Sequence, residues 1–434
     1  MGGVAPDVDR PASTSGRAPV WWALLAFAGI SAVLTAVVTI GSTTAGPTLP
    51  YLDGPVWLDG WSEGDSGWYY GIATYGYFYN PGEQSSIAFF PSYPLAVRGV
   101  GDLIGGDYQI AGSLIGVLAG AAAVVLFAQW VWQRLPRGGA ITAIAVMMVY
   151  PYAFFLYGAM YSDSLFLLTA VGAFVLLERR YYWLAGLVGV VATAGRPVGV
   201  AVAIGLVIRM LEMRAEATLA ARPVEYSADP TDKALPDDPD KKTPVVEPPR
   251  RTFRPGWRDL LRSVPAVRWR EAGVLVSGLG LAAWCVYLWI QFGDPVAFAT
   301  VQEAPGWYQR GGPHTWFKVV YIGTMVFGPV DVAIRLTAQA IMCLLAILLL
   351  PRVWRLFGWG YLAYSFVVLA IPIIGTKDFM GTGRYVLAAF PVIAAAGDFL
   401  VTRQRGWIRP VVLILLAAGL VVATAVFSMG VAVS

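Results

Sequence analysis

One carboxylate in this sequence, Asp65, lies in a setting that suits general-base catalysis. The stretch from Gly64 to Tyr77 reads GDSGWYYGIATYGY, so small residues flank Asp65, and Trp68 and Tyr69 follow within one helical turn. A carboxylate in partly dry surroundings can take a proton from a hydroxyl group, because burial raises its pKa toward the working range. We therefore predict that Asp65 is a catalytic base and that Trp68 and Tyr69 flank a substrate. An Asp before a helical run is also a favoured N-cap, and both roles could hold together.

Cations in distant loops suit a phosphate group on the same substrate. We predict that Arg384 binds this phosphate, with help from Arg196 or His314. Each of these cations, and the acid Asp163, has a purely structural role open to it. Asp163 could favour a helix dipole at the start of a helix, and Arg196 could cap the end of one. Arg384 could snorkel to the membrane interface, and His314 could be an ordinary loop residue.

The composition places these residues in a polytopic membrane protein. Of the 434 residues, 57% are apolar and only 13% are charged, far from the roughly 25% charged residues of a soluble domain. Long unbroken apolar runs, without alternation at period two, predict helices. Several runs of about 20 residues carry no charge and are long enough to cross a bilayer as helices. We expect an all-α fold with about eleven transmembrane helices, of which the third to sixth are short. They cover about residues 20–43, 108–132, 140–158, 165–177, 182–194, 198–211, 272–292, 332–350, 356–374, 385–401 and 411–429.

Changes in composition divide the chain. Residues 1–19 are polar and expected to be disordered, and residues 20–213 form an N-terminal membrane half whose catalytic outer loop spans 45–107. Residues 214–268 carry many prolines, acids and arginines, which predicts a disordered cytoplasmic linker. Residues 269–434 form the C-terminal membrane half.

The distribution of Lys and Arg predicts the orientation. One set of loops carries most of the basic residues and the linker, so it should be cytoplasmic. The Asp65 loop and the loops with His314 and Arg384 then share the extracytoplasmic face of the cell membrane. The net charge of +4 is small and does not suggest a nucleic-acid partner. His314 is the only histidine, and both cysteines lie in apolar runs, so we expect no metal site and no cofactor.

Five short blocks resemble the PIG-V family, the mannosyltransferases that add the second mannose of GPI anchors, and their bacterial relatives. These are the Asp65 stretch, AFFPSYP from Ala88, YSDSLF from Tyr161, TAGRPVG from Thr193 and GRYVLAAFP from Gly383. They fall in the family's order and cover most of the membrane portion.

This resemblance implies a glycosyltransferase of the GT-C fold. It implies inverting transfer of mannose from polyprenyl-phosphate mannose to a lipid or glycolipid acceptor, and it puts the catalytic carboxylate on Asp65. It also places Asp163, Arg196 and Arg384 at family-typical positions.

Two other functions stay open at this point. A transporter or flippase of lipid-linked sugars would need ionisable groups along a pathway and broken helices. The break at Arg196 and Pro197 is the feature that favours it. A noncatalytic scaffold that binds partners through the linker is the third hypothesis.

Overall fold

The computed structural model describes residues 18–45, 55–221, 254–309, 311–402 and 405–433, and every regular element in them is helical. The expected disordered N-terminus and most of the expected linker lie outside these ranges. The α-helices are α1 Val20–Ala45, α2 Val56–Asp59, α3 Ser66–Tyr75, α4 Ser92–Leu103, α5 Tyr108–Trp132, α6 Arg137–Val149, α7 Asp163–Glu178, α8 Tyr182–Thr193, α9 Val200–Ala220, α10 Trp257–Ser263, α11 Trp269–Ala272, α12 Leu279–Phe292, α13 Ala297–Thr300, α14 Pro313–Trp316, α15 Val319–Phe327, α16 Val330–Phe357, α17 Trp359–Gly375, α18 Thr382–Ala388, α19 Phe390–Thr402 and α20 Ile408–Ser428. Six 3-10 segments join them: η1 Ser86–Ala88, η2 Pro151–Leu156, η3 Pro197–Gly199, η4 Val264–Ala266, η5 Gly273–Gly278 and η6 Val301–Glu303.

The all-α prediction for a multi-pass membrane protein is confirmed, but the expected number of spans is not. Within the described residues, 5 helices are long and apolar enough to cross a membrane, or up to 6 if the bent pair α18 and α19 forms one span. The five are α1, α5, the segment from Trp269 to Phe292, α16 and α20. Large apolar side chains on them point outward, as contact with lipid requires; Ile290 is 79% exposed.

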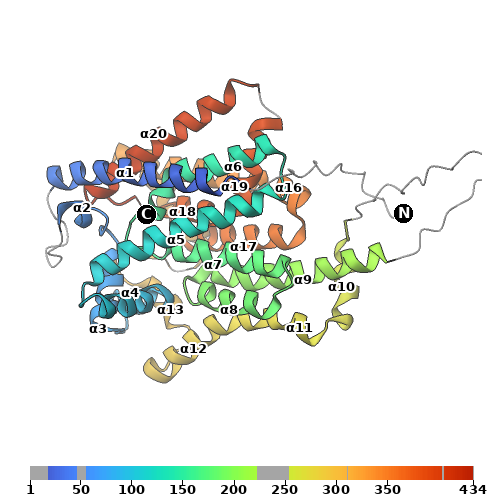
Figure 1. The fold of residues 1–434 in the computed structure, drawn as a ribbon. Helices are drawn as coiled ribbons and strands as arrows, with labels where there is room; N and C mark the ends of the chain where they lie inside the picture. The colour runs from blue at the N-terminus through green and yellow to red at the C-terminus, as the bar shows by residue number, and fades with distance from the viewer. Residues whose placement is uncertain (1–17, 46–54, 222–253, 310, 403–404, 434) are drawn as a thin grey trace, which may run out of the picture.

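The helices form a bundle with two distinct ends (Figure 1). α1 packs beside α20 on one flank, and α8 packs beside α12 on another. α3 and α4 lie at one end, and α9 extends with α10 to the other. Helix α7 runs between these two ends of the bundle, and its 16 residues correspond to about 24 Å of helix.

Small residues let the central helix α5 approach the chain segment that follows α6. A Cβ atom on Gly120 would lie 2.1 Å from the Leu156 carbonyl oxygen, so any larger residue would push the two segments apart. The short approach is the kind that Gly permits between membrane helices. This contact keeps η2, and the start of α7 after it, close to α5.

Prolines end two of the expected spans earlier than hydropathy indicates. The span expected at 140–158 ends as a helix at Val149, because Tyr150 precedes Pro151 and takes the extended backbone that such a position favours. The span expected at 385–401 is broken before Pro391 into α18 and α19, which meet at 79°. Both expectations of a continuous helix were wrong. Arg384 lies on α18, the short helix that precedes the second break.

The linker expected at 214–268 begins later and ends earlier in the structure. Helix α9 continues to Ala220, and its residues Arg209 and Arg214 form ion pairs with Glu212 and Glu271. Residues 257–263 form α10, which packs against α9. Helices therefore occupy residues near both edges of the expected linker, residues 222–253 lie outside the described part, and the linker stays a prediction.

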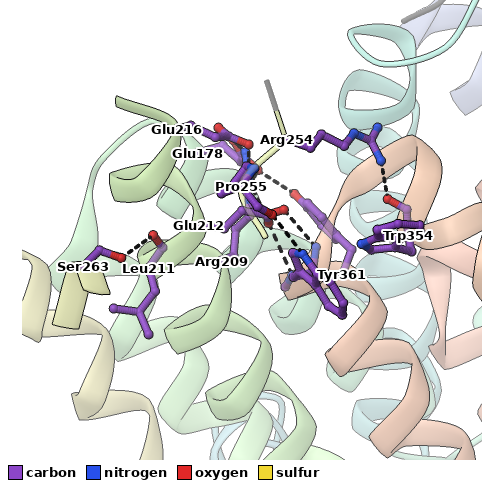
Figure 2. A network of polar contacts seen from close by, with 12 residues as sticks. Glu178, Arg209, Leu211, Glu212, Glu216, Arg254, Pro255, Ser263, Trp354 and Tyr361 are labelled. Atoms are coloured by element: carbon purple, nitrogen blue, oxygen red, sulfur yellow. Dashed lines mark hydrogen bonds and ion pairs between the residues drawn. The ribbon is translucent and has the colours of Figure 1, made fainter. Parts of the chain in front are cut away.

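A network of ion pairs closes the end of the bundle away from α3 (Figure 2). Arg209 donates to Glu178 at 2.8 Å and to Glu216 at 3.0 Å, and it pairs with Glu212 at 2.9 Å. The Tyr361 hydroxyl donates to Glu178 at 3.0 Å. Three carboxylates around one guanidinium thus tie α7, α9 and α17 together.

Candidate active site

Asp65 takes the N-cap position of α3, but its side chain does not cap the helix. Gly64 turns the chain with a φ of 62°, which favours glycine, and α3 starts at Ser66 and ends where Gly76 has a φ of 88°. The Asp65 carboxylate makes no capping hydrogen bond to the α3 backbone. Its side chain is therefore available for another partner.

That partner is Arg384, from the far end of the sequence. The Asp65 Oδ2 atom lies 3.5 Å from Nη2 of Arg384, and Arg384 Nη1 lies 4.0 Å from Oδ2 of Asp163. The other oxygen of Asp163 accepts a short hydrogen bond from Arg196 Nη1. Two carboxylates and two guanidinium groups alternate in this row, which we call the charge cluster. Three predicted site residues thus lie in one row with Asp65, and Arg384 is the one that contacts it.

Burial divides the charge cluster into a closed part and an open part. The side chains of Asp163 and Arg196 are only 4% and 5% exposed, whereas that of Asp65 is 30% exposed. Breaking a buried ion pair costs much more free energy of folding than breaking one that is partly exposed to water. The open side of the cluster is therefore the side at which a ligand can reach Asp65.

The surroundings of Asp65 favour its protonated form. Desolvation by the protein raises the pKa of the carboxyl above its ordinary value of 3.8, and the negative charge of Asp163 adds to this shift. Arg384 and Arg196 oppose it. A carboxyl with a raised pKa holds a proton more firmly once it has taken it, as a general base must.

Two polar atoms of the charge cluster are buried without a hydrogen-bond partner in the described part of the chain. They are Nε of Arg384 and Oδ2 of Asp163. Buried polar atoms are nearly always satisfied, so each unsatisfied one calls for an explanation. A phosphate oxygen, which accepts from a guanidinium donor, would explain the unused Nε.

Several buried groups fix the backbone that carries Arg384. The Gly383 N–H donates to Gln339 of α16 at 3.1 Å, and its carbonyl accepts from the Tyr150 hydroxyl at 2.9 Å. A Cβ atom on Gly383 would lie 2.3 Å from the Tyr152 ring. The segment before Arg384 is held from another loop. There, Lys318 donates to the carbonyls of Thr376 and Asp378 at 2.6 and 3.1 Å. The backbone from which the Arg384 side chain extends is therefore held in place by hydrogen bonds.

The two aromatic residues predicted to flank a substrate take different places. Tyr69 is buried, and its hydroxyl lies 3.0 Å from Oγ of Ser162, next to Asp163. Trp68 is partly exposed and stacks on Phe89, with ring centroids 5.6 Å apart, while Trp307 lies 5.7 Å away. Trp68 is therefore the one that can meet a ligand, and Tyr69 supports the loop of Asp163.

The structure does not bring His314 into the charge cluster. It lies on the short helix α14, and no hydrogen bond, ion pair or ring contact joins it to the cluster among the residues described. Its predicted role in substrate binding stays a prediction from sequence. Lys318, four residues later, is the residue of this loop that reaches toward the segment before Arg384.

One neighbour of Asp65 was missed by sequence reasoning. The Tyr161 hydroxyl accepts a hydrogen bond from the Asp65 backbone N–H at 2.7 Å, and Arg384 lies over the Tyr161 ring at 5.6 Å. A Cβ atom on Gly64 would come within 2.6 Å of the same hydroxyl. The signal was available, because Tyr161 opens the block that was singled out for Asp163.

The described residues contain no group of three or more His, Cys, Asp or Glu side chains close enough to hold a metal ion. The charge cluster itself offers two carboxylates, both of which face guanidinium groups. As built, it suits an anion better than a cation.

Comparison with known proteins gives distant likenesses of shape only. No family model and no curated protein matches the chain. The oligosaccharyltransferase AglB from Archaeoglobus fulgidus, solved with an inhibitory peptide and a dolichol-phosphate, matches with a TM-score of 0.42 at 11% identity. That match covers 93% of this chain and 56% of AglB. The arabinofuranosyltransferase AftD from Mycobacteria matches with a TM-score of 0.38 at 15% identity, over 97% of this chain and 28% of AftD.

This chain therefore spans about half the length of the oligosaccharyltransferase and less of the arabinofuranosyltransferase. With every TM-score below 0.5, these likenesses do not decide its activity. The predicted membership of the PIG-V family is not shown by them and stays a prediction.

Proposed function

We propose that this protein is an integral-membrane glycosyltransferase of the GT-C type, which transfers a sugar from a polyprenyl-phosphate donor to a hydroxyl group. The observation that carries the proposal is the pairing of Asp65 with Arg384 at 3.5 Å. In this pairing a candidate base, Asp65, lies beside a candidate phosphate-binding residue, Arg384, in a partly open site, although the two are far apart in sequence.

In the proposed reaction, each member of the pair acts on a different part of the substrates. Asp65 takes the proton of the acceptor hydroxyl, and the acceptor oxygen attacks the anomeric carbon of the donor sugar. The bond between that carbon and the phosphate oxygen breaks, and polyprenyl phosphate leaves with the electron pair. Arg384 holds the negative charge of the leaving phosphate. Attack from the face opposite the leaving group inverts the anomeric centre.

Binding of the donor would also free the base. In the structure described here, Arg384 faces the Asp65 carboxylate. A phosphate that takes the guanidinium, including its unused Nε, would compete with Asp65 for this partner. Losing the cation weakens the interaction that favours the ionised carboxylate, so the pKa of Asp65 would rise further. The base would then be strongest when the donor is bound.

The choice of mannose rests on the sequence blocks that resemble the PIG-V family. On that basis we propose polyprenyl-phosphate mannose as donor and a lipid or glycolipid as acceptor. From the distribution of Lys and Arg among the loops of the sequence, we also propose that the site lies on the extracytoplasmic face of the cell membrane. Trp68 and its aromatic neighbours would lie beside the bound sugar.

The test is transfer of radiolabel from polyprenyl-phosphate mannose to lipid in membranes that contain the protein. We expect Asp65→Asn to abolish transfer while expression and folding stay near those of the wild type. Asp102→Asn is the matched control, because Asp102 is an exposed carboxylate outside the charge cluster that accepts a hydrogen bond from the Tyr108 hydroxyl at 2.9 Å. Wild-type turnover by Asp65→Asn would overturn the assignment of the base.

A transporter or flippase of lipid-linked sugars is the second candidate, and the bend of 79° between α18 and α19 is the feature that favours it. Broken helices line the substrate sites of many transporters. Proteoliposomes separate the two functions: a flippase moves labelled polyprenyl-phosphate sugar across the bilayer without any transfer to an acceptor. Transfer that depends on Asp65 would reject this alternative.

A further inference from the structure

The end of the bundle away from the charge cluster carries a groove with an unusual combination of side chains. It has a volume of about 640 Å³ and is lined by residues 180–184, at the start of α8, and 268–271, around α11. It is not part of the proposed active site, since α7 separates them: Asp163 begins this helix and Glu178, next to the groove, ends it.

Three arginines line the groove, and none has an ion pair within the described part of the chain. They are Arg180, Arg268 and Arg270, and all three side chains are exposed. The acid of the groove, Glu271, is already paired with Arg214 and also accepts the backbone N–H of Arg268 at 2.8 Å. The groove therefore keeps a clear excess of positive charge.

The neighbouring carboxylates do not supply the missing partners. Glu178 is held by Arg209 at 2.8 Å and by Arg134 at 3.4 Å, and Glu212 and Glu216 bind Arg209 as well (Figure 2). These carboxylates are already held by other arginines, so they do not neutralise the three arginines that line the groove.

Aromatic and apolar side chains continue from the arginines along the bundle. The rings of Trp183 and Trp269 lie 5.4 Å apart, and Trp269 is 77% exposed. Further along the two segments that carry the lining residues, three leucines are exposed: Leu187 on α8, Leu275 on η5 and Leu279 at the start of α12. Exposed tryptophans mark the level of lipid headgroups, and leucines beyond them face acyl chains.

We propose that this groove binds one anionic phospholipid, with its phosphate among the three arginines and its acyl chains along α8 and α12. Basic pockets between helices on the cytoplasmic side of a membrane suit such headgroups. The start of α8 adds the positive end of a helix dipole to the same place. A free phosphate would gain only the exposed arginines, whereas a lipid gains the apolar walls too.

Native mass spectrometry of the detergent-purified protein tests the proposal with phosphatidylglycerol, phosphatidylcholine and inorganic phosphate as probes. We expect retained phosphatidylglycerol and little of the other two. The double variant Arg268→Gln/Arg270→Gln should lower the affinity for phosphatidylglycerol roughly thirtyfold, as expected for two lost charges at a lipid surface. Equal retention of phosphatidylcholine, or binding of inorganic phosphate that displaces the lipid, would overturn the proposal.

The matched control is Arg258→Gln/Arg262→Gln on α10, which removes the same charge from the same end of the protein. Arg258 lies over the Trp257 ring and Arg262 is 75% exposed, and neither lines the groove. We expect this variant to retain phosphatidylglycerol as the wild type does. An equal loss in both variants would mean diffuse attraction and no site.

Two further measurements keep the proposal open to rejection. If the double variant does not fold, Arg180→Asn replaces it, because asparagine tolerates the φ of 63° that Arg180 adopts; affinity should fall severalfold. The second measurement replaces the acidic residues Asp237, Asp238 and Asp240 with asparagine. The proposal requires lipid retention to stay unchanged, and a rise in retention would contradict it.

Discussion

Asp163 and Asp65 face the same guanidinium group, yet their removal should have opposite consequences. Asp163→Asn leaves Arg196, which is 5% exposed, and Arg384, which is 13% exposed, without a charged partner in the closed part of the charge cluster. Breaking a buried ion pair in this way costs about 3–5 kcal/mol. Asp65→Asn removes a contact of 3.5 Å at a side chain that is 30% exposed, which costs about 1 kcal/mol or less.

The assay is the fraction of purified protein that stays monodisperse in detergent after heating. For a chain of this size, 3–5 kcal/mol corresponds to a loss of melting temperature on the order of 3–6 °C. We expect this loss for Asp163→Asn, and a change of about 1 °C or less for Asp65→Asn. Asp65→Asn should nevertheless be the variant that cannot transfer sugar.

A second substitution separates the cost of an unpaired charge from the cost of changed packing. The double variant Asp163→Asn/Arg196→Gln restores charge neutrality of the cluster, so it should recover about 1–3 kcal/mol of the lost stability. If Asp163→Asn melts within about 1 °C of Asp65→Asn, or if the double variant recovers nothing, the argument from burial is refuted.

Three further predictions concern the placing and titration of the same groups. Tyr161→Phe removes the acceptor of the Asp65 N–H and should lower transfer tenfold to a hundredfold, while stability measured by heating falls by about 1 kcal/mol. Gly383→Ala puts a methyl group against the Tyr152 ring and should cost about 1–3 kcal/mol of stability and shift Arg384, seen as a raised KM for the donor. Transfer should rise with pH as Asp65 loses its proton, with the midpoint of kcat/KM above 3.8 because burial raises this pKa.

Each of these has an outcome that contradicts it. Unchanged kcat and KM in Tyr161→Phe would show that the hydrogen bond does not position Asp65. A Gly383→Ala protein with wild-type melting and KM would show that the contact with Tyr152 relaxes freely. A rate that falls as pH rises through this range would mean that the protonated form of Asp65, and not the carboxylate, is the active one.

The sequence by itself determined the class of the protein and the local context of Asp65. Low charge and long apolar runs are properties of composition, and they fix helices in a membrane whatever the packing. Gly64 and Gly76 bound the helix after Asp65, and the resemblance of five short blocks selected Asp163, Arg196 and Arg384 before any geometry was known. Hydropathy could not place the helix breaks, since a proline such as Pro391 leaves the apolar pattern intact while it interrupts the backbone hydrogen bonds.

Only the tertiary structure decided which of these charges meet. Periodicity reports the faces of one helix, whereas the pairing of Asp65 with Arg384 depends on how α3, α7 and α18 pack, which is set by contacts between residues distant in sequence. The same packing left His314 out of the charge cluster and brought the Tyr161 hydroxyl onto the Asp65 backbone. It also sets burial, which leaves the Asp163 side chain 4% exposed and the Asp65 side chain 30% exposed.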